Sequence, residues 1–235
     1  MKILGIDTST MMGAVGIVDG ETLIAEMRTN IAVMHSERLM LHVDTLLKSA
    51  KMTLAEIDGF AVTTGPGSFT GLRIGLAAVK AMAYAAGKPV AGIPTLDVLA
   101  DNLPFCKHQV SPVLDARKKM VYAAIYKQTD TVRKTILEPS VLTPDELADM
   151  VEEPTVFLGE GAYVYRQLLE ERLCCQALFA PRAYSYPSGA AVAFRGIKEI
   201  SAGRVSDPMS LVPSYIRKSD AEEKKAAKSH TPPLR

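Results

Sequence analysis

The loop Gly65-Pro-Gly-Ser-Phe-Thr-Gly71 joins a short apolar stretch, Ile57–Thr63, to a longer one, Thr70–Ala86. The short stretch has the pattern of a buried strand, and the long one has the length of a helix. A glycine-rich loop between a strand and a helix can present backbone N–H groups to an anion. The same glycines could instead serve a tight turn that needs positive φ. The strand–loop–helix order predicts an α/β fold.

The loop does not match the standard nucleotide motifs. A Walker A loop needs Gly-Lys-Ser/Thr after four spacer residues, and the dinucleotide fingerprint needs Gly where Thr70 stands. Ser68 is no nucleophile elbow, because Pro66 and Thr70 occupy positions that need Gly. The polar segment Asp7-Thr-Ser-Thr10 could bind a phosphate or a hydrated Mg²⁺, or it could close a hairpin as an Asx-type turn.

The helix predicted over residues 70–86 is apolar on almost every side, with Arg73 and Lys80 as its only charges. Such a helix is covered on both sides. We expect one side to pack on the sheet and the other on a second subunit or within a larger core. Its small-residue face comprises Gly71, Gly75, Ala78, Met82 and Ala85. A second helix is predicted over residues 36–50 from the apolar stripe Leu39, Val43, Leu46, Leu47 and Ala50.

The pattern of strands and helices predicts two lobes. Up to residue 95 the order is β-β-β-α-β-α-β, and a second hairpin-like pair of strands restarts the pattern at Val110–Leu114 and Met120–Tyr126. Further along, a short helix opens at Pro144 and another helix runs through residues 159–171. We expect a first lobe over residues 1–104, a smaller second lobe over 105–218 and a disordered tail over 219–235. The pattern leaves open which lobe residues 212–218 join.

Composition and charge exclude several classes of protein. The 235 residues carry 27 Lys+Arg against 26 Asp+Glu, and 48% are hydrophobic, as in ordinary globular proteins. A net charge of +1 argues against a protein that holds nucleic acid by charge alone. The acidic side chain of Asp7 interrupts the apolar N-terminal segment, so we do not expect this segment to be a signal peptide. No apolar stretch is long enough to span a membrane. Three unevenly spaced cysteines suit a reducing compartment, so a cytoplasmic location is expected.

Two further groups of residues are candidate sites. His35 and His42 stand seven residues apart, not four, and neither His-Glu-x-x-His nor Cys-x-x-Cys occurs, so no metal site is expected. The charged turn Asp115-Ala-Arg-Lys-Lys119 could contact RNA or a partner through its cations, or it could be a solvated turn.

These motifs together resemble the TsaB (YeaZ) family, bacterial partners in making threonylcarbamoyladenosine in tRNA. The most specific match is Val62-Thr-Thr-Gly-Pro-Gly-Ser-Phe-Thr-Gly-Leu-Arg73. Shorter matches extend over nearly the whole chain: Leu4–Ser9, Gly92–Leu96, Leu114–Arg117 with Val121-Tyr122, Gly159–Gly161 and Tyr215–Arg217. The resemblance implies a two-lobed actin-like and sugar-kinase-like (ribonuclease H-like) fold with a reduced second lobe.

The family's catalytic relative, TsaD, transfers threonylcarbamoyl to the adenosine 3′ of the anticodon. It holds a metal with His-x-x-x-His after an Ile-Pro segment similar to Ile93-Pro94. The corresponding stretch here, Thr95–Asp101, contains no histidine, and the turn 115–119 replaces a Ser/Gly-rich phosphate loop. The resemblance therefore implies a scaffold subunit without catalytic residues, metal or cofactor of its own. The residues that would correspond to a vestigial nucleotide site are Asp7, Thr8, Ser9, Gly65, Gly67 and Ser68.

The resemblance also implies partners. Family members pair with TsaD through the two helices predicted at 36–50 and 70–86, a TsaE-type ATPase joins them, and these partners handle ATP and Mg²⁺. The expected interface residues are Leu39, Val43, Leu46, Gly71, Arg73, Ile74, Gly75, Ala78 and Met82. Alone, the same face would form a homodimer, and tRNA is the substrate of the complex. Flexible Met11, Met12, Met34, Met40 and Met82 suit such a surface or fill gaps in the core.

An alternative is a stand-alone ATP-dependent phosphotransferase of the actin and sugar-kinase superfamily. It would use Asp7 and the loop Gly65–Gly71. Phosphoryl transfer needs a phosphate cradle and positioned cations, and the charged turn at residues 115–119 is poorly suited to wrap a phosphate.

Overall fold

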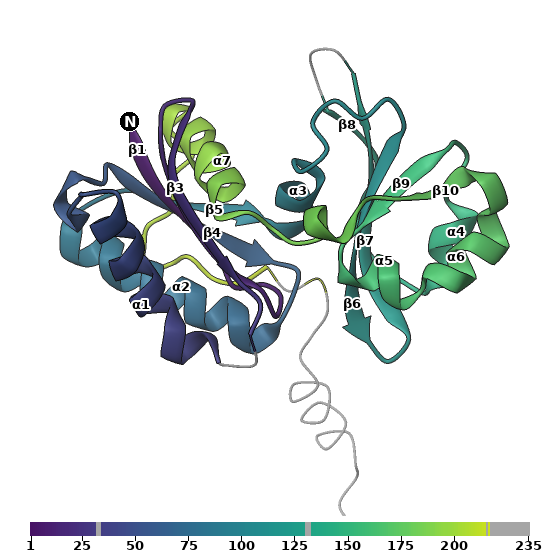
Figure 1. Cartoon of the computed structure of the whole chain (residues 1–235), viewed down its shortest axis with the longest axis horizontal. Helices are drawn as coiled ribbons and strands as arrows, with labels where there is room; N and C mark the ends of the chain where they lie inside the picture. The colour runs from purple at the N-terminus through teal and green to yellow at the C-terminus, as the bar shows by residue number, and fades with distance from the viewer. Residues whose placement is uncertain (32–33, 130–132, 215, 217–235) are drawn as a thin grey trace, which may run out of the picture.

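The computed structural model describes residues 1–31, 34–129, 133–214 and 216. Within them, the strands form two five-stranded sheets, each the core of one lobe (Figure 1). The strands of the first sheet are β1 (Lys2–Asp7), β2 (Gly13–Asp19), β3 (Thr22–Thr29), β4 (Gly59–Gly65) and β5 (Val90–Pro94). Those of the second are β6 (Gln109–Arg117), β7 (Met120–Gln128), β8 (Arg133–Leu142), β9 (Thr155–Leu158) and β10 (Ala177–Phe179).

The two sheets share one topology. The first has the order β3-β2-β1-β4-β5, and the second has the corresponding order β8-β7-β6-β9-β10. In each sheet the first strand pairs antiparallel with the second and parallel with the fourth. Each lobe therefore begins with a hairpin and repeats the same plan, which confirms the two-lobed α/β fold predicted from the sequence.

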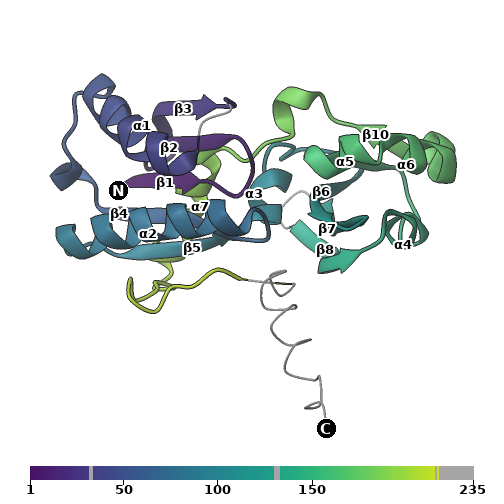
Figure 2. The ribbon, with the colours of Figure 1, turned by 90° about the horizontal axis from the view of Figure 1, so that it is seen from below.

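Helices cover both faces of the first sheet. Helices α1 (His35–Ser49) and α2 (Phe69–Ala86) lie on one face and α7 (Gly189–Ser201) on the other (Figures 1 and 2). Because side chains alternate along a strand, Leu4 and Ile6 pack toward α1 and α2, whereas Ile3 packs toward α7. The two helices predicted at residues 36–50 and 70–86 are confirmed, each shifted by one residue at its start.

Helix α7 belongs to the first lobe, although the sequence interpretation placed residues 105–218 in the second. Its start approaches the backbone of β1 and β2 so closely that a Cβ at Gly5 or Gly16 would overlap Gly189 or Ala190. Glu26 of β3 accepts hydrogen bonds from Ser188 Oγ at 2.6 Å and from the Ala190 N–H at 3.1 Å. The predicted lobe boundary is therefore wrong for α7, because the chain returns to the first sheet.

The segment that follows α7 also lies on the first lobe. The N–H of Ser206 donates to the Val90 carbonyl at 2.8 Å, Leu211 is buried in the core beneath α1 and α2, and the N–H of Ser214 donates to Thr64 at 2.7 Å. Residues 212–214 thus join the first lobe, a question that the sequence pattern left open. The predicted disordered tail, residues 219–235, lies outside the described residues.

The second lobe is built from shorter elements. Its helices are α4 (Pro144–Asp149), α5 (Glu160–Val164) and α6 (Arg166–Leu173). The single helix predicted over 159–171 is interrupted at Tyr165, whose φ of −107° and ψ of 18° are not helical. The sequence analysis missed β8 because it is an edge strand with alternately exposed side chains, which weakens the apolar pattern. No helix among the described residues is long and apolar enough to cross a membrane.

The short helix α3 (Thr95–Ala100), which follows β5, links the two lobes through charged side chains. Asp101 pairs with Arg195 of α7 and with Arg133 of β8. Asp97 accepts hydrogen bonds from Arg195 at 3.2 Å and from the Tyr126 hydroxyl of β7 at 2.7 Å. All of these side chains are half-buried or buried. The network joins α7, which packs on the first sheet, to β7 and β8 of the second sheet, and we name it the α3 network.

Arg195→Met is expected to lower the free energy of unfolding by about 1–3 kcal/mol, because it leaves two half-buried carboxylates with fewer charged donors. The matched control is Arg204→Met, which removes an exposed pair with Glu199 of α7 and should have a much smaller effect, because solvent screens exposed pairs. Urea unfolding at 50 mM and 500 mM salt measures both. Equal effects of the two substitutions would show that the α3 network is no stronger than an exposed ion pair.

Candidate functional site

Asp7 lies at the end of β1 and is fully buried. Its Oδ1 accepts hydrogen bonds from Thr63 Oγ1 at 2.7 Å, Ser9 Oγ at 2.6 Å and the Ser9 N–H at 3.2 Å. Its Oδ2 is buried and has no hydrogen-bond partner among the described residues. Burial raises the pKa of Asp7 to about 6, although the hydrogen bonds from Ser9 and Thr63 lower it. The carboxyl group is therefore held by its own loop, with one oxygen uncommitted.

The glycine-rich loop sits directly on the segment that follows Asp7. The N–H of Ser68 donates to the Ser9 carbonyl at 2.7 Å, and a Cβ at Gly67 would overlap Ser9. Ser68 Oγ accepts from the Gly71 N–H at 3.2 Å and so caps the start of α2. The structure places Asp7–Ser9 against Gly67 and Ser68 of the six residues proposed as a vestigial nucleotide site, whereas Gly65 packs against Ser214 and Leu72. Nucleotide binding by them remains a prediction.

The half-buried His35 and the buried Arg38 anchor the segment on its other side, a role that the sequence did not predict. His35 Nε2 donates to the Thr10 carbonyl at 2.8 Å, and Arg38 Nη2 donates to the Met11 carbonyl at 2.8 Å. Arg38 also lies 3.2 Å from His35 Nδ1, which places the ring proton on Nε2. No motif marks these residues, because their role depends on α1 lying beside the β1–β2 loop.

Most of the residues expected to form a protein interface lie inside the first lobe instead. Six of them are buried, so the prediction that they form an interface is wrong: Leu39, Val43, Leu46, Gly71, Gly75 and Met82. The glycines of this set serve internal packing, since a Cβ at Gly71 or Gly75 would overlap Thr8. Thr8 Oγ1 donates to the Gly71 carbonyl at 2.7 Å. Arg73 is exposed, and Ile74 and Ala78 are half-buried.

The exposed face of α1 and α2 carries other apolar residues. On α1, Leu41 is 63% exposed and Met40 is 50% exposed, and on α2 Tyr84 is 75% exposed. Tyr84 stands in a stripe with the exposed Ala77, Ala81 and Ala85. The two helices lie side by side on the sheet (Figure 2). Helix α2 therefore does expose apolar residues, but they are not the residues that the sequence led us to expect at an interface. We name Met40, Leu41, Ala77, Ala81, Tyr84 and Ala85 the helix face.

The charged turn of the second lobe is the tip of the β6–β7 hairpin. Arg117 pairs with Met120 across the hairpin, so that Lys118 and Lys119 form a two-residue turn. All three cations have positive φ, between 51° and 63°, a conformation in which residues other than Gly are uncommon. Asp115 accepts a hydrogen bond from the Arg117 N–H at 2.9 Å. We name Arg117, Lys118 and Lys119 the hairpin tip.

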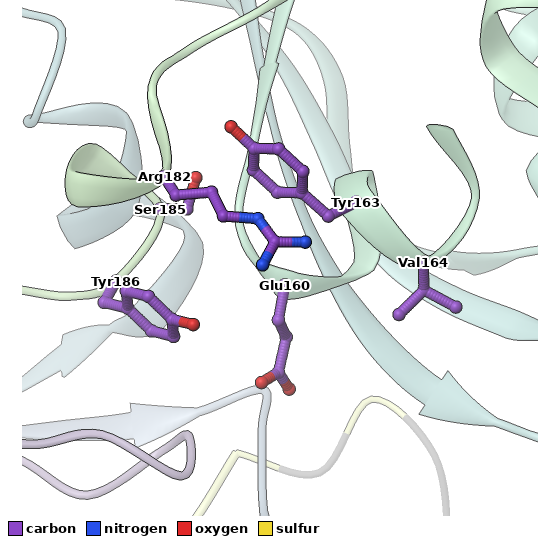
Figure 3. Close-up of a pocket in the computed structure, with 6 residues that line it drawn as sticks. All are labelled: Glu160, Tyr163, Val164, Arg182, Ser185 and Tyr186. Atoms are coloured by element: carbon purple, nitrogen blue, oxygen red, sulfur yellow. The ribbon is translucent and has the colours of Figure 1, made fainter. Parts of the chain in front are cut away.

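A pocket of about 260 Å³ opens beside the hairpin, between α5 and the segment that leads to α7 (Figure 3). It is lined by Glu160, Tyr163, Val164, Arg182, Ser185 and Tyr186. Burial and then the charge of Asp115 raise the pKa of Glu160 above its ordinary value, while Arg117 acts in the opposite direction. The sequence indicated a helix after Gly159-Glu-Gly161 and a family resemblance there, but it did not predict a pocket.

No group of three or more His, Cys, Asp or Glu side chains in the described part of the chain could hold a metal ion. Thr95–Ala100 form α3, and Asp97 of this helix and Asp101, which follows it, pair with arginines. Cys106, Cys174 and Cys175 are free thiols.

Comparison with known proteins identifies the family. The family model "TsaD: tRNA N6-adenosine threonylcarbamoyltransferase" matches residues 28–225. The tRNA threonylcarbamoyladenosine biosynthesis protein TsaB of Bacillus subtilis is 31% identical, over 95% of this chain and 97% of its own. TsaB of Escherichia coli is 33% identical over 73% of this chain and 76% of its own.

A solved structure shows the same fold. YeaZ from Pseudomonas aeruginosa superposes with a TM-score of 0.76 at 25% identity, covering 91% of this chain and 99% of that one. Together with the matching sequence over almost the full length, this confirms the two-lobed actin-like fold. The chain belongs to the TsaB (YeaZ) family.

Proposed function

We propose that this chain is a non-catalytic subunit of the assembly that forms threonylcarbamoyladenosine in tRNA, and that it binds a TsaD-type catalytic subunit. Membership of the TsaB family carries this proposal, because the Bacillus subtilis relative is named for that pathway. A TsaE-type ATPase joins through the TsaD-type subunit, and these partners handle ATP and Mg²⁺. The tRNA is the substrate of the whole complex, which works in the cytoplasm.

The helix face supports a protein partner. Leu41 and Tyr84 expose large apolar side chains on adjacent helices, at 63% and 75% exposure. The small exposed residues Ala77, Ala81 and Ala85 stand on α2 beside Tyr84 and allow the backbone of another helix to come close. Exposed apolar residues that cluster in this way mark interaction sites. Without its partner, the same face would pair with a second copy of the chain and give a homodimer.

A second candidate is an ATP-dependent phosphotransferase, and one observation favours it. The uncommitted Oδ2 of Asp7 lies next to the glycine-rich loop, where a phosphate or hydrated cation could reach it only if the two loops separated. The contacts between Ser68 and Ser9 oppose that separation. Micromolar binding of Mg·ATP by the isolated chain in isothermal titration, with turnover lost in Asp7→Ala, would favour the enzyme.

Ala81→Glu is expected to weaken the complex with the TsaD-type subunit by at least a hundredfold, because an unpaired charge would be buried in the contact. Ala81 is exposed in the isolated chain, so the fold should be unaffected. The control, Ala202→Glu, adds the same charge at the exposed end of α7, on the opposite face of the sheet. Isothermal titration measures affinity, and light scattering measures the homodimer. Unchanged binding by Ala81→Glu would contradict the proposed face.

Asp7→Asn is expected to remove a pH dependence of stability. The carboxyl group binds its proton more tightly in the folded chain, with a pKa of about 6 against 3.8. The contribution of Asp7 to the free energy of unfolding should therefore fall by about 3 kcal/mol as pH rises from about 4 to about 6. Urea unfolding across that range should show this fall as a difference between the wild type and Asp7→Asn, and Asp44→Asn, an exposed control on α1, should follow the wild type. The same fall in Asp7→Asn would refute a titrating Asp7.

A further inference from the structure

The pocket beside the hairpin tip is separate from the helix face, and it is lined by different residues. Its walls come from α5 and from the crossing segment that leads to α7, so it lies at the junction of the lobes (Figures 1 and 3). The α3 network lies nearby, because Asn102 Nδ2 donates to the carbonyls of Tyr184 at 2.7 Å and Tyr186 at 2.9 Å. The segment that carries three of the lining residues is thus held in place.

Flat groups line this pocket. The Arg182 guanidinium lies over the Tyr163 ring, 4.7 Å from its centroid. The Tyr163 hydroxyl donates to the Ala180 carbonyl, which fixes the ring. Figure 3 shows Tyr186 reaching toward the same opening from the crossing segment. Aromatic rings and a guanidinium plane are the groups on which an unstacked nucleobase stacks.

Polar groups at the edge of the pocket can bond to a base. Glu160 presents a half-buried carboxyl group, which can accept from an amino group and, when protonated, donate to a ring nitrogen. Ser185 is buried, and its hydroxyl has no partner among the described residues. The acidic surroundings of Glu160, which include Asp115 and Asp7, disfavour a phosphate at this end. The chemistry of this end therefore suits a neutral base.

Cations and exposed rings extend the site beyond the pocket. The start of α5 packs on the end of β6, since a Cβ at Gly161 would lie 2.8 Å from Leu114, so the hairpin tip stands close to Glu160. On another side, Phe105 is 92% exposed and Tyr184 is 49% exposed. Phe105 lies three residues beyond Asn102, which contacts Tyr184. Cations interleaved with aromatic rings are typical of surfaces that bind single strands.

We propose that this pocket receives one unstacked base of a single-stranded RNA segment, and that the hairpin tip and Arg182 contact the phosphates on either side of it. The inference rests on the proposed function, because a tRNA loop is the single-stranded RNA that such a complex would meet. It adds a direct RNA contact to a chain whose net charge of +1 does not suggest one. A duplex would not fit, because its bases are already stacked.

Fluorescence polarisation with the full chain and a labelled single-stranded RNA heptamer containing one adenine tests this site. Tyr186→Ala and Arg182→Ala should each weaken binding about tenfold, whereas Tyr186→Phe should retain it because the ring stays. The control Arg172→Ala removes an exposed cation that pairs with Asp145 and Asp149 of α4 and should leave the affinity unchanged. Thermal unfolding verifies that each variant is folded.

The proposal would be overturned if the wild type did not bind the heptamer, or if both alanine variants bound it as tightly as the wild type does. It would also be overturned if the wild type bound a duplex or free AMP as tightly as it binds the heptamer. The proposed function is tested separately by titrating Tyr186→Ala with the TsaD-type subunit, which should bind as the wild type does. If the wild type formed no complex with the TsaD-type subunit, the subunit role would be overturned. If only RNA binding were absent, only this site would be overturned.

Discussion

The contact between the β1–β2 loop and α2 is the constraint on which the first lobe depends. It exists because Gly67, Gly71 and Gly75 carry no side chains where Thr8 and Ser9 approach. Backbone meets backbone there, so the space that two separate loops would leave for a phosphate is filled by the chain itself. The same contact fixes α2 on the sheet, and it thereby decides which residues of that helix point outward.

The second constraint is electrostatic and joins the lobes. Asp97 of α3 and Asp101, at the C-terminal cap of that helix, pair with arginines from α7 and β8. Since α7 packs on the first sheet and β8 belongs to the second, these pairs connect elements that backbone hydrogen bonds do not. The pocket lies beside this junction, and Asn102 ties its crossing segment to α3. The shape of the pocket therefore depends on the relative placement of the two lobes.

The sequence predicted the repeated plan of the lobes, because strands and helices with one buried face leave a clear period. It did not predict that α7 returns to the first sheet, since that return is made through backbone contacts at Gly5 and Gly16, which have no pattern of their own. The interface residues were misassigned for a related reason. Small residues on α2 indicate close packing, but the sequence does not say whether Thr8 or another subunit is the neighbour.

These findings divide the molecule into two surfaces of different chemistry. The helix face consists of exposed apolar side chains on α1 and α2, which suit a protein partner that excludes water. The pocket and hairpin tip combine rings, cations and hydrogen-bonding groups, and three successive cations there are held at positive φ. Positive φ at both central residues is what a two-residue hairpin turn requires, so the tight turn itself fixes the direction of these side chains. A chain whose Lys and Arg are balanced by Asp and Glu can thus still present three successive cations at one hairpin, on a different lobe from the apolar side chains that α1 and α2 expose.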